Sequence, residues 1–194
     1  MQVQCVWVQP GRQQLLMTGN LSQQSEACIR NVKDFVEAAA AAIAERLGVA
    51  APPHSLMRPG CDLHVHVEHG YQPVAPTYQM GAIYAAMVSL LFGRRAREDV
   101  MIFGEVGNLG GFSSNCPLEE ENIEICKGQG YRRAILGTGT RVSEAARRAA
   151  SQPHGDDGKP CLELMIMVTK SISEQRGGVY FPVLQGEETR DPGG

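Results

Sequence analysis

The chain has 194 residues, of which 43% are hydrophobic, and this is enough for one domain with a sizeable core. Its 18 basic and 21 acidic residues give a net charge of −3, which is not the basic excess typical of a nucleic-acid-binding surface. No apolar run approaches the roughly 20 residues that a membrane-spanning helix requires.

The N-terminal part of the chain predicts a β-hairpin followed by a long helix. Residues 3–8 alternate as a strand, Pro10-Gly11 marks a turn, and residues 14–18 predict the returning strand. Residues 25–47 carry apolar side chains at spacings of three and four, which is typical of a helix that ends at Gly48. Because the sequence enters a strand at once, we expect no signal peptide and a domain taken from a longer protein.

The middle of the chain continues with a strand and a strongly apolar helix. Residues 62–68 alternate as a strand, and residues 78–92 predict a helix that meets a cluster of arginines at its C-terminal end. Residues 100–103 predict a short buried strand that leads into a glycine-rich turn at 104–111. The next helix is predicted over 118–127, with an acidic start that suits the helix dipole.

The remaining pattern predicts a strand at 133–136, a helix at 142–150, a polar loop at 151–160 and a strand at 162–168. Strands and helices therefore alternate, which indicates an α/β or α+β class. The chain then becomes polar and glycine-rich except at residues 179–184. We expect one domain over 1–172 and a tail over 173–194, whose apolar residues either form a strand on the domain's own sheet, stay loose, or dock on a neighbour by strand addition.

Four short motifs follow one another along the chain: LLMTGNL at 15–21, DLHVHVEHG at 62–70, AMVSLLFG at 86–93 followed by REDV at 97–100, and GEV at 104–106. Together, in this order and spacing, they resemble the proteolytic domain of Lon-type proteases over roughly residues 3–170. The resemblance implies an α+β fold with a mixed sheet and packed helices, as in domain 2 of ribosomal protein S5.

The same resemblance locates the catalytic positions, and there this sequence departs from the family. The family uses a serine nucleophile and a lysine base. Counting along the motifs puts Tyr78 at the serine, Glu119 at the lysine and Gly107 at a supporting threonine. A phenol with a pKa near 10 is a poor acyl-transfer nucleophile, and a carboxylate opposes a developing oxyanion. The vestigial groove around these positions would include Thr77, Gln79, Met80, Glu105 and Cys116.

These substitutions predict a pseudoprotease, a non-catalytic domain that serves in assembly or in protein and peptide binding. One hypothesis is that Glu119 accepts a hydrogen bond from the Tyr78 hydroxyl as a structural replacement for the dyad. The alternative, an active peptidase, requires a relocated nucleophile and a base within hydrogen-bonding reach. Lys127 lies about two turns beyond Glu119 and is too distant to act as that base. The candidate nucleophiles nearby are Thr77, Ser113, Ser114 and Cys116.

Other motifs in the chain favour structural roles, so we predict no metal and no cofactor. His64 and His66 share one face of a strand, a spacing that zinc sites also use, but a histidine on a core strand is more often a hydrogen-bonded structural group. The glycine-rich turn lacks the lysine and the serine or threonine of a P-loop. Six cysteines without a C-x-x-C pair argue against a zinc ribbon and predict free thiols in a reducing intracellular compartment, which the sequence does not specify further.

The resemblance also implies partners. Lon-type domains pack into a ring, usually six-fold, beneath an ATPase module, and this chain carries no ATPase motif. We therefore expect a homo-oligomer, with an ATPase module in cis or in trans and a protein or peptide partner. The FGEVG stretch at 103–107 also resembles the Lon-like domain of the bacterial RadA repair ATPase, and the chain carries many arginines. A ring platform for a DNA-handling ATPase is therefore the other alternative, although the net charge argues against DNA, and no membrane association is expected.

Overall fold

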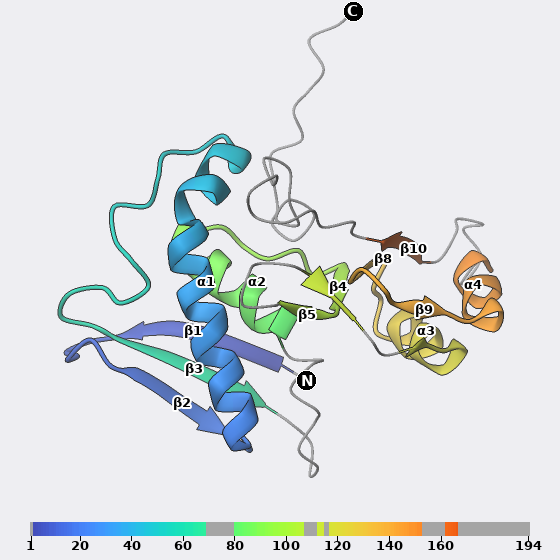
Figure 1. Cartoon of the computed structure of the whole chain (residues 1–194), viewed down its shortest axis with the longest axis horizontal. Coiled ribbons are helices and arrows are strands. Elements are labelled where there is room, and N and C mark those ends of the chain that lie inside the picture. Colours follow the sequence, from blue (N-terminus) through green and yellow to red (C-terminus); the bar gives the residue numbers. More distant parts are fainter. Residues whose placement is uncertain (1, 69–79, 107–111, 115–116, 153–161, 167–194) are drawn as a thin grey trace, which may run out of the picture.

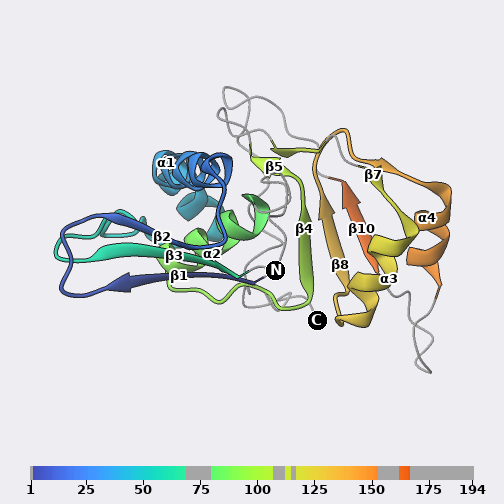
Figure 2. The same cartoon turned by 90° about the horizontal axis from the view of Figure 1, so that it is seen from below.

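The computed structural model describes residues 2–68, 80–106, 112–114, 117–152 and 162–166 of the chain. Its N-terminal half is a three-stranded sheet with two helices on one face (Figures 1 and 2). The sheet has the order β1 (Gln2–Val8), β3 (Asp62–Glu68), β2 (Leu15–Gly19), with β1 antiparallel and β2 parallel to β3. The covering helices are α1 (Gln23–Leu47) and α2 (Met80–Phe92).

The predicted hairpin is wrong in its pairing, although both strands exist. Strand β3 lies between β1 and β2, so the turn joins two strands that are not neighbours in the sheet. The reason is that the connection bonds to the chain just before β3. Asp62 Oδ1 accepts from the backbone N–H groups of Arg12 at 2.7 Å and Gln14 at 2.8 Å, and Gly11 N donates to Gly60 O at 2.8 Å. These long-range bonds outweigh local hairpin pairing.

The first core lies between this sheet and the two helices. Leu63, Val65 and Val67 of β3 are fully buried, whereas His64 and His66 alternate onto the opposite face. Helix α2 is buried almost all round because it packs against β1 as well as against α1 and β4. Helix α1 begins after the Ser22 cap, two residues before its predicted start, and ends at Gly48 as its sequence pattern predicted.

A second, fully parallel sheet forms the C-terminal half. Its order is β10 (Glu163–Ile166), β8 (Arg133–Leu136), β4 (Val100–Phe103). Helix α2 lies on one side of it, and α3 (Glu120–Gly128) and α4 (Glu144–Ser151) lie on the other (Figure 2). Strand β8 is buried on both faces: Ile135 belongs to the first core, and Ala134 and Leu136 belong to the second.

One of two short strand pairs explains why two helices begin later than predicted. Strand β7 (Pro117–Leu118) pairs in parallel with β9 (Arg141–Val142), so α3 starts only at Glu120 and α4 only at Glu144. Strand β5 (Glu105–Val106) pairs antiparallel with β6 (Phe112–Ser113). The mixed first sheet, the parallel second sheet and the packed helices confirm the α+β class. The boundary at residue 172 and the tail lie outside the described residues and stay predictions.

Candidate functional site

The candidate site lies at the carboxyl edge of the parallel sheet. The start of α2, at Gly81, lies against Ile102 and Gly104 at the end of β4. Helix α3 ends at the opposite edge, because Arg132 N donates to Asp99 O at 2.8 Å just before β4 begins. The N-termini of α2 and α3 therefore share the carboxyl edge, where parallel sheets commonly place ligands. Glu119, which the motifs assign to the lysine position, lies at the start of α3, whereas Tyr78 lies outside the described residues.

Gly104 and Gly137 allow the backbone of β6 to pack closely against the ends of β4 and β8 at this edge. A Cβ atom on Gly104, which has φ +155°, would lie 2.8 Å from Phe112 Cζ and 2.9 Å from Ser113 O. A Cβ atom on Gly137 would lie 2.4 Å from the backbone carbon of Ser113. Backbone bonds from Gly137 N to Phe103 O and from Thr138 N to Phe112 O, both 2.9 Å, fix β6 beside the ends of β4 and β8. Gly104, the first residue of the predicted glycine-rich turn, is thus a packed part of the edge, and residues 107–111 of that turn lie outside the described residues.

The structure describes three of the predicted site residues. Met80 opens α2 with 5% of its surface exposed and belongs to the first core. Glu105 is half-buried in β5, close enough to Cys28 for its charge to act on that thiol. Glu119 is exposed at the N-cap of α3. Five predicted site positions lie outside the described residues: Thr77, Tyr78, Gln79, Gly107 and Cys116.

Glu119 has a structural role that the motif comparison missed. Its backbone N–H donates to Asn122 Oδ1 at 2.9 Å, and Asn122 N donates back to Glu119 O at 3.1 Å. These bonds satisfy amides that a helix start otherwise leaves unpaired. A carboxylate here is also favoured by the positive end of the helix dipole, which would oppose an ammonium group. The spacing of Glu119 and Asn122 in the sequence was the available signal for this cap.

Lys127 does not supply the missing amine at this edge. It lies eight residues beyond Glu119, about 12 Å along α3. Its side chain is 3% exposed, and its Nζ forms an ion pair with Glu124 Oε1 at 3.1 Å. The prediction that Lys127 is too distant to act as base at the Glu119 position is therefore supported by its placement.

The described cysteines are free thiols, and the environments of three of them disfavour the reactive thiolate. Burial raises the pKa of Cys5 to about 12 and that of Cys126 to about 11. Burial, and secondly the negative charge of Glu105, raises the pKa of Cys28. None of these three thiols is an activated nucleophile.

The two strand histidines are hydrogen-bonded to a shared hydroxyl. Thr18 Oγ1 lies 2.7 Å from His64 Nε2 and 2.8 Å from His66 Nδ1, on the face of the sheet away from the core. These bonds favour the structural interpretation of the H-x-H pair. Within the described ranges, no group of three or more histidine, cysteine or acidic side chains is arranged to hold a metal ion.

The REDV motif also has a local explanation that sequence reasoning missed. The Arg97 guanidinium donates Nε to Asp99 Oδ1 at 2.9 Å and Nη2 to Asp99 Oδ2 at 2.8 Å. Asp99 O accepts in turn from the backbone of Arg132 and Arg133, so the pair anchors the amino edge of the sheet. Arg133 is itself paired with Glu163 at 2.9 Å. Arg97 and Arg133 are thus each paired with an acidic side chain within the domain.

Comparison with known proteins agrees with this geometry. A family model described as the Lon protease (S16) C-terminal proteolytic domain matches residues 1–125. A curated relative, the Lon protease of Phenylobacterium zucineum (strain HLK1), is 29% identical over 135 residues, which cover 70% of this chain. The match spans only 16% of that relative's own length. In the part of the chain that the structure describes, no helix has the length and apolarity to cross a membrane.

Proposed function

Because the chain belongs to the family of Lon protease C-terminal proteolytic domains, we propose that it is a non-catalytic member, a pseudoprotease that serves in assembly and in protein or peptide binding. The observation that carries the proposal is the environment of Glu119. The position assigned to a general base holds an exposed carboxylate at the start of α3. A carboxylate is a much weaker base than the neutral amine of a lysine, and its negative charge repels a developing oxyanion.

The sequence adds two further substitutions in support. Tyr78 replaces the nucleophilic serine and Gly107 replaces the supporting threonine, and both lie outside the described residues. Three independent losses fit a retained fold without its chemistry better than they fit a single inactivating change. The hypothesis that Glu119 bonds the Tyr78 hydroxyl predicts that Tyr78→Phe lowers the melting temperature by a few degrees. An unchanged melting temperature would contradict that bond.

A peptidase assay tests the proposal directly. The chain is incubated with fluorogenic casein and with a mixed fluorogenic peptide library, and an active Lon protease serves as the positive control. We expect no cleavage above that of buffer. Cleavage that co-purifies with the chain and is lost in a Ser113→Ala, Ser114→Ala or Cys116→Ala variant would instead establish a relocated nucleophile. A Tyr78→Ser/Glu119→Lys/Gly107→Thr variant asks whether the retained fold can regain turnover.

The proposal includes a place in a larger assembly. Since the match covers a small part of the relative's length, we propose that the domain works within a longer, ATPase-containing protein and forms a homo-oligomeric, hexameric ring in a reducing intracellular compartment. Co-purification from cells, followed by mass determination under native conditions, tests the ATPase association and the oligomeric state. A full-length protein without an ATPase module or partner would refute the ATPase association.

A further inference from the structure

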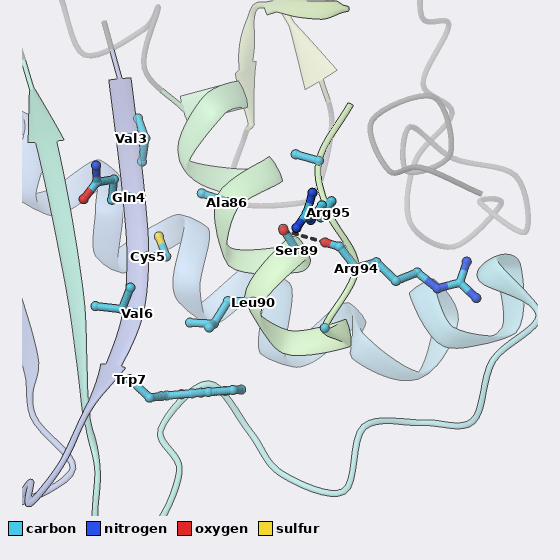
Figure 3. Close-up of a pocket in the computed structure, with 12 residues that line it drawn as sticks. Val3, Gln4, Cys5, Val6, Trp7, Ala86, Ser89, Leu90, Arg94 and Arg95 are labelled. Atoms are coloured by element: carbon cyan, nitrogen blue, oxygen red, sulfur yellow. Dashed lines mark hydrogen bonds between the residues drawn. The ribbon is translucent and has the colours of Figure 1, made fainter. Parts of the chain in front are cut away.

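Away from the candidate site, the structure has a groove of about 630 Å³ along the outer edge of β1. One wall is β1, the floor is the C-terminal half of α2, and the other wall is the segment Arg94–Ala96 (Figure 3). The lining is mostly apolar, with Cys5, Ala86 and Leu90 facing the groove. It lies beside the C-terminal half of α2, whereas the candidate site lies at the N-terminal end of the same helix.

The backbone of β1 faces this groove with free hydrogen-bonding capacity. Leu63 N donates to Gln14 O at 2.9 Å, so the odd-numbered residues of β3 direct their amides toward β2. The even-numbered residues of β3 therefore bond to their partners in β1, which are also even-numbered. Three residues of β1 then direct N–H and C=O groups into the groove, and no bond joins these to another described residue: Val3, Cys5 and Trp7. An edge of this kind is a template for an added strand.

From this groove we infer that β1 binds residues 179–184 of a second copy of this chain as an added strand, which deepens the assembly role proposed above and rests on it. The segment VYFPVL is rich in β-branched and aromatic residues, and it is the longest apolar run outside the described residues. Removing apolar side chains of this kind from water is favourable, so the segment gains free energy when another surface covers it. Pro182 has no N–H, so residues 179, 181 and 183 bond to β1 while Pro182 faces away.

Charge complementarity supports the same occupant. Arg95 is exposed and lines the groove, whereas the Arg94 side chain points away from it (Figure 3). No acidic partner of Arg95 is found among the described residues. The segment is followed by Glu187 and Glu188, about 13 Å beyond Val183 in an extended chain. A contact between the tail of one copy and the groove of the next is heterologous, so repeating the contact closes a ring or extends a filament.

Two complementary variants of the full chain test the inference by sedimentation velocity over a range of concentrations. Phe181→Asp impairs the docking segment and leaves the groove intact, and Ala86→Lys fills the groove floor and leaves the tail intact. We expect the unchanged chain to associate and each variant alone to be monomeric. Their equimolar mixture should form one-to-one dimers and nothing larger, because only one intact contact is available. Unchanged melting temperatures verify that both variants fold.

Charge variants test the register. Arg95→Glu should weaken association about tenfold, Glu187→Lys/Glu188→Lys in the same chain should restore it, and the matched control Arg94→Glu should change it less than twofold. Monomers at every concentration, or a mixture that stays monomeric, would overturn the inference, as would association that survives both Phe181→Asp and Ala86→Lys. Association that survives both substitutions would leave the assembly role intact and would refute only the proposed docking contact. The peptidase assay reports on the loss of catalysis independently of either result.

Discussion

The crossing at the carboxyl edge of the second sheet predicts a graded set of glycine-to-alanine effects. Gly104 combines a positive φ with a close approach, Gly137 has the close approach without a positive φ, and Gly130 has φ +81° with open space around its Cβ position. We expect Gly130→Ala to cost about 1 kcal/mol from backbone strain alone. Gly137→Ala should cost about 2–3 kcal/mol from overpacking, and Gly104→Ala about 3–4 kcal/mol because both causes act.

Thermal and urea unfolding of the three variants provide the measurement. A domain of this size loses roughly 2–4 °C of melting temperature per kcal/mol, so Gly104→Ala should melt about 10 °C lower than the unchanged chain. The conformational freedom that alanine removes from the unfolded chain is the same in all three variants, so their order does not depend on it. Urea m-values should stay constant. If Gly104→Ala unfolds no more readily than Gly130→Ala, the packed crossing described here is wrong.

Further outcomes follow from the ion pair, the thiols and the arginines. Hydrogen bonds from Arg97 lower the pKa of Asp99, so the pair's stabilisation is full above pH about 4 and is lost as the pH falls through the lowered folded-state pKa. Arg97→Ala should therefore cost about 1 kcal/mol at pH 7 in urea unfolding and nearly nothing at pH 2, and an equal cost at both would contradict the pairing. At pH 8, iodoacetamide should label Cys5 and Cys126 far more slowly in the folded chain than in urea, as followed by peptide mass mapping; equal rates would show that burial does not protect them. In an electrophoretic shift assay, duplex DNA should stay unbound at 150 mM salt, and a salt-sensitive shift there would favour the DNA-handling alternative.

The sequence predicts best those elements whose pattern is local. Strand β3 was predicted with its observed bounds because Leu63, Val65 and Val67 alternate with polar residues. The non-adjacency of β1 and β2 could not be predicted, since it depends on bonds from Asp62, about fifty residues away. The two-residue strands at the carboxyl edge of the second sheet are too short to show an alternating pattern of apolar and polar residues. They include Pro117–Leu118, which displaced the predicted start of α3.

For the candidate site, the assignment of Tyr78 and Glu119 to the dyad positions stays a prediction, and the sequence did not predict what Glu119 does locally. Its interpretation as a substituted lysine came from motif counting, whereas its bond to Asn122 is a helix-start feature visible only when the helix boundary is right. The β1 groove was not predicted at all. A groove depends on which strand lies at the edge of the sheet, and that order was the part of the fold that sequence periodicity could not establish.

Helix α2 has a different surface site of the domain at each of its two ends. Its 13 residues span about 20 Å, with the carboxyl edge of the second sheet at one end and the β1 groove beside the other. Its apolar surface is enclosed between two sheets, so the helix acts as a rigid spacer between them. A designer could therefore introduce a nucleophile near the first end while keeping the second as an anchoring point. Loss of chemistry and retention of contacts can thus evolve, or be engineered, independently on one helix.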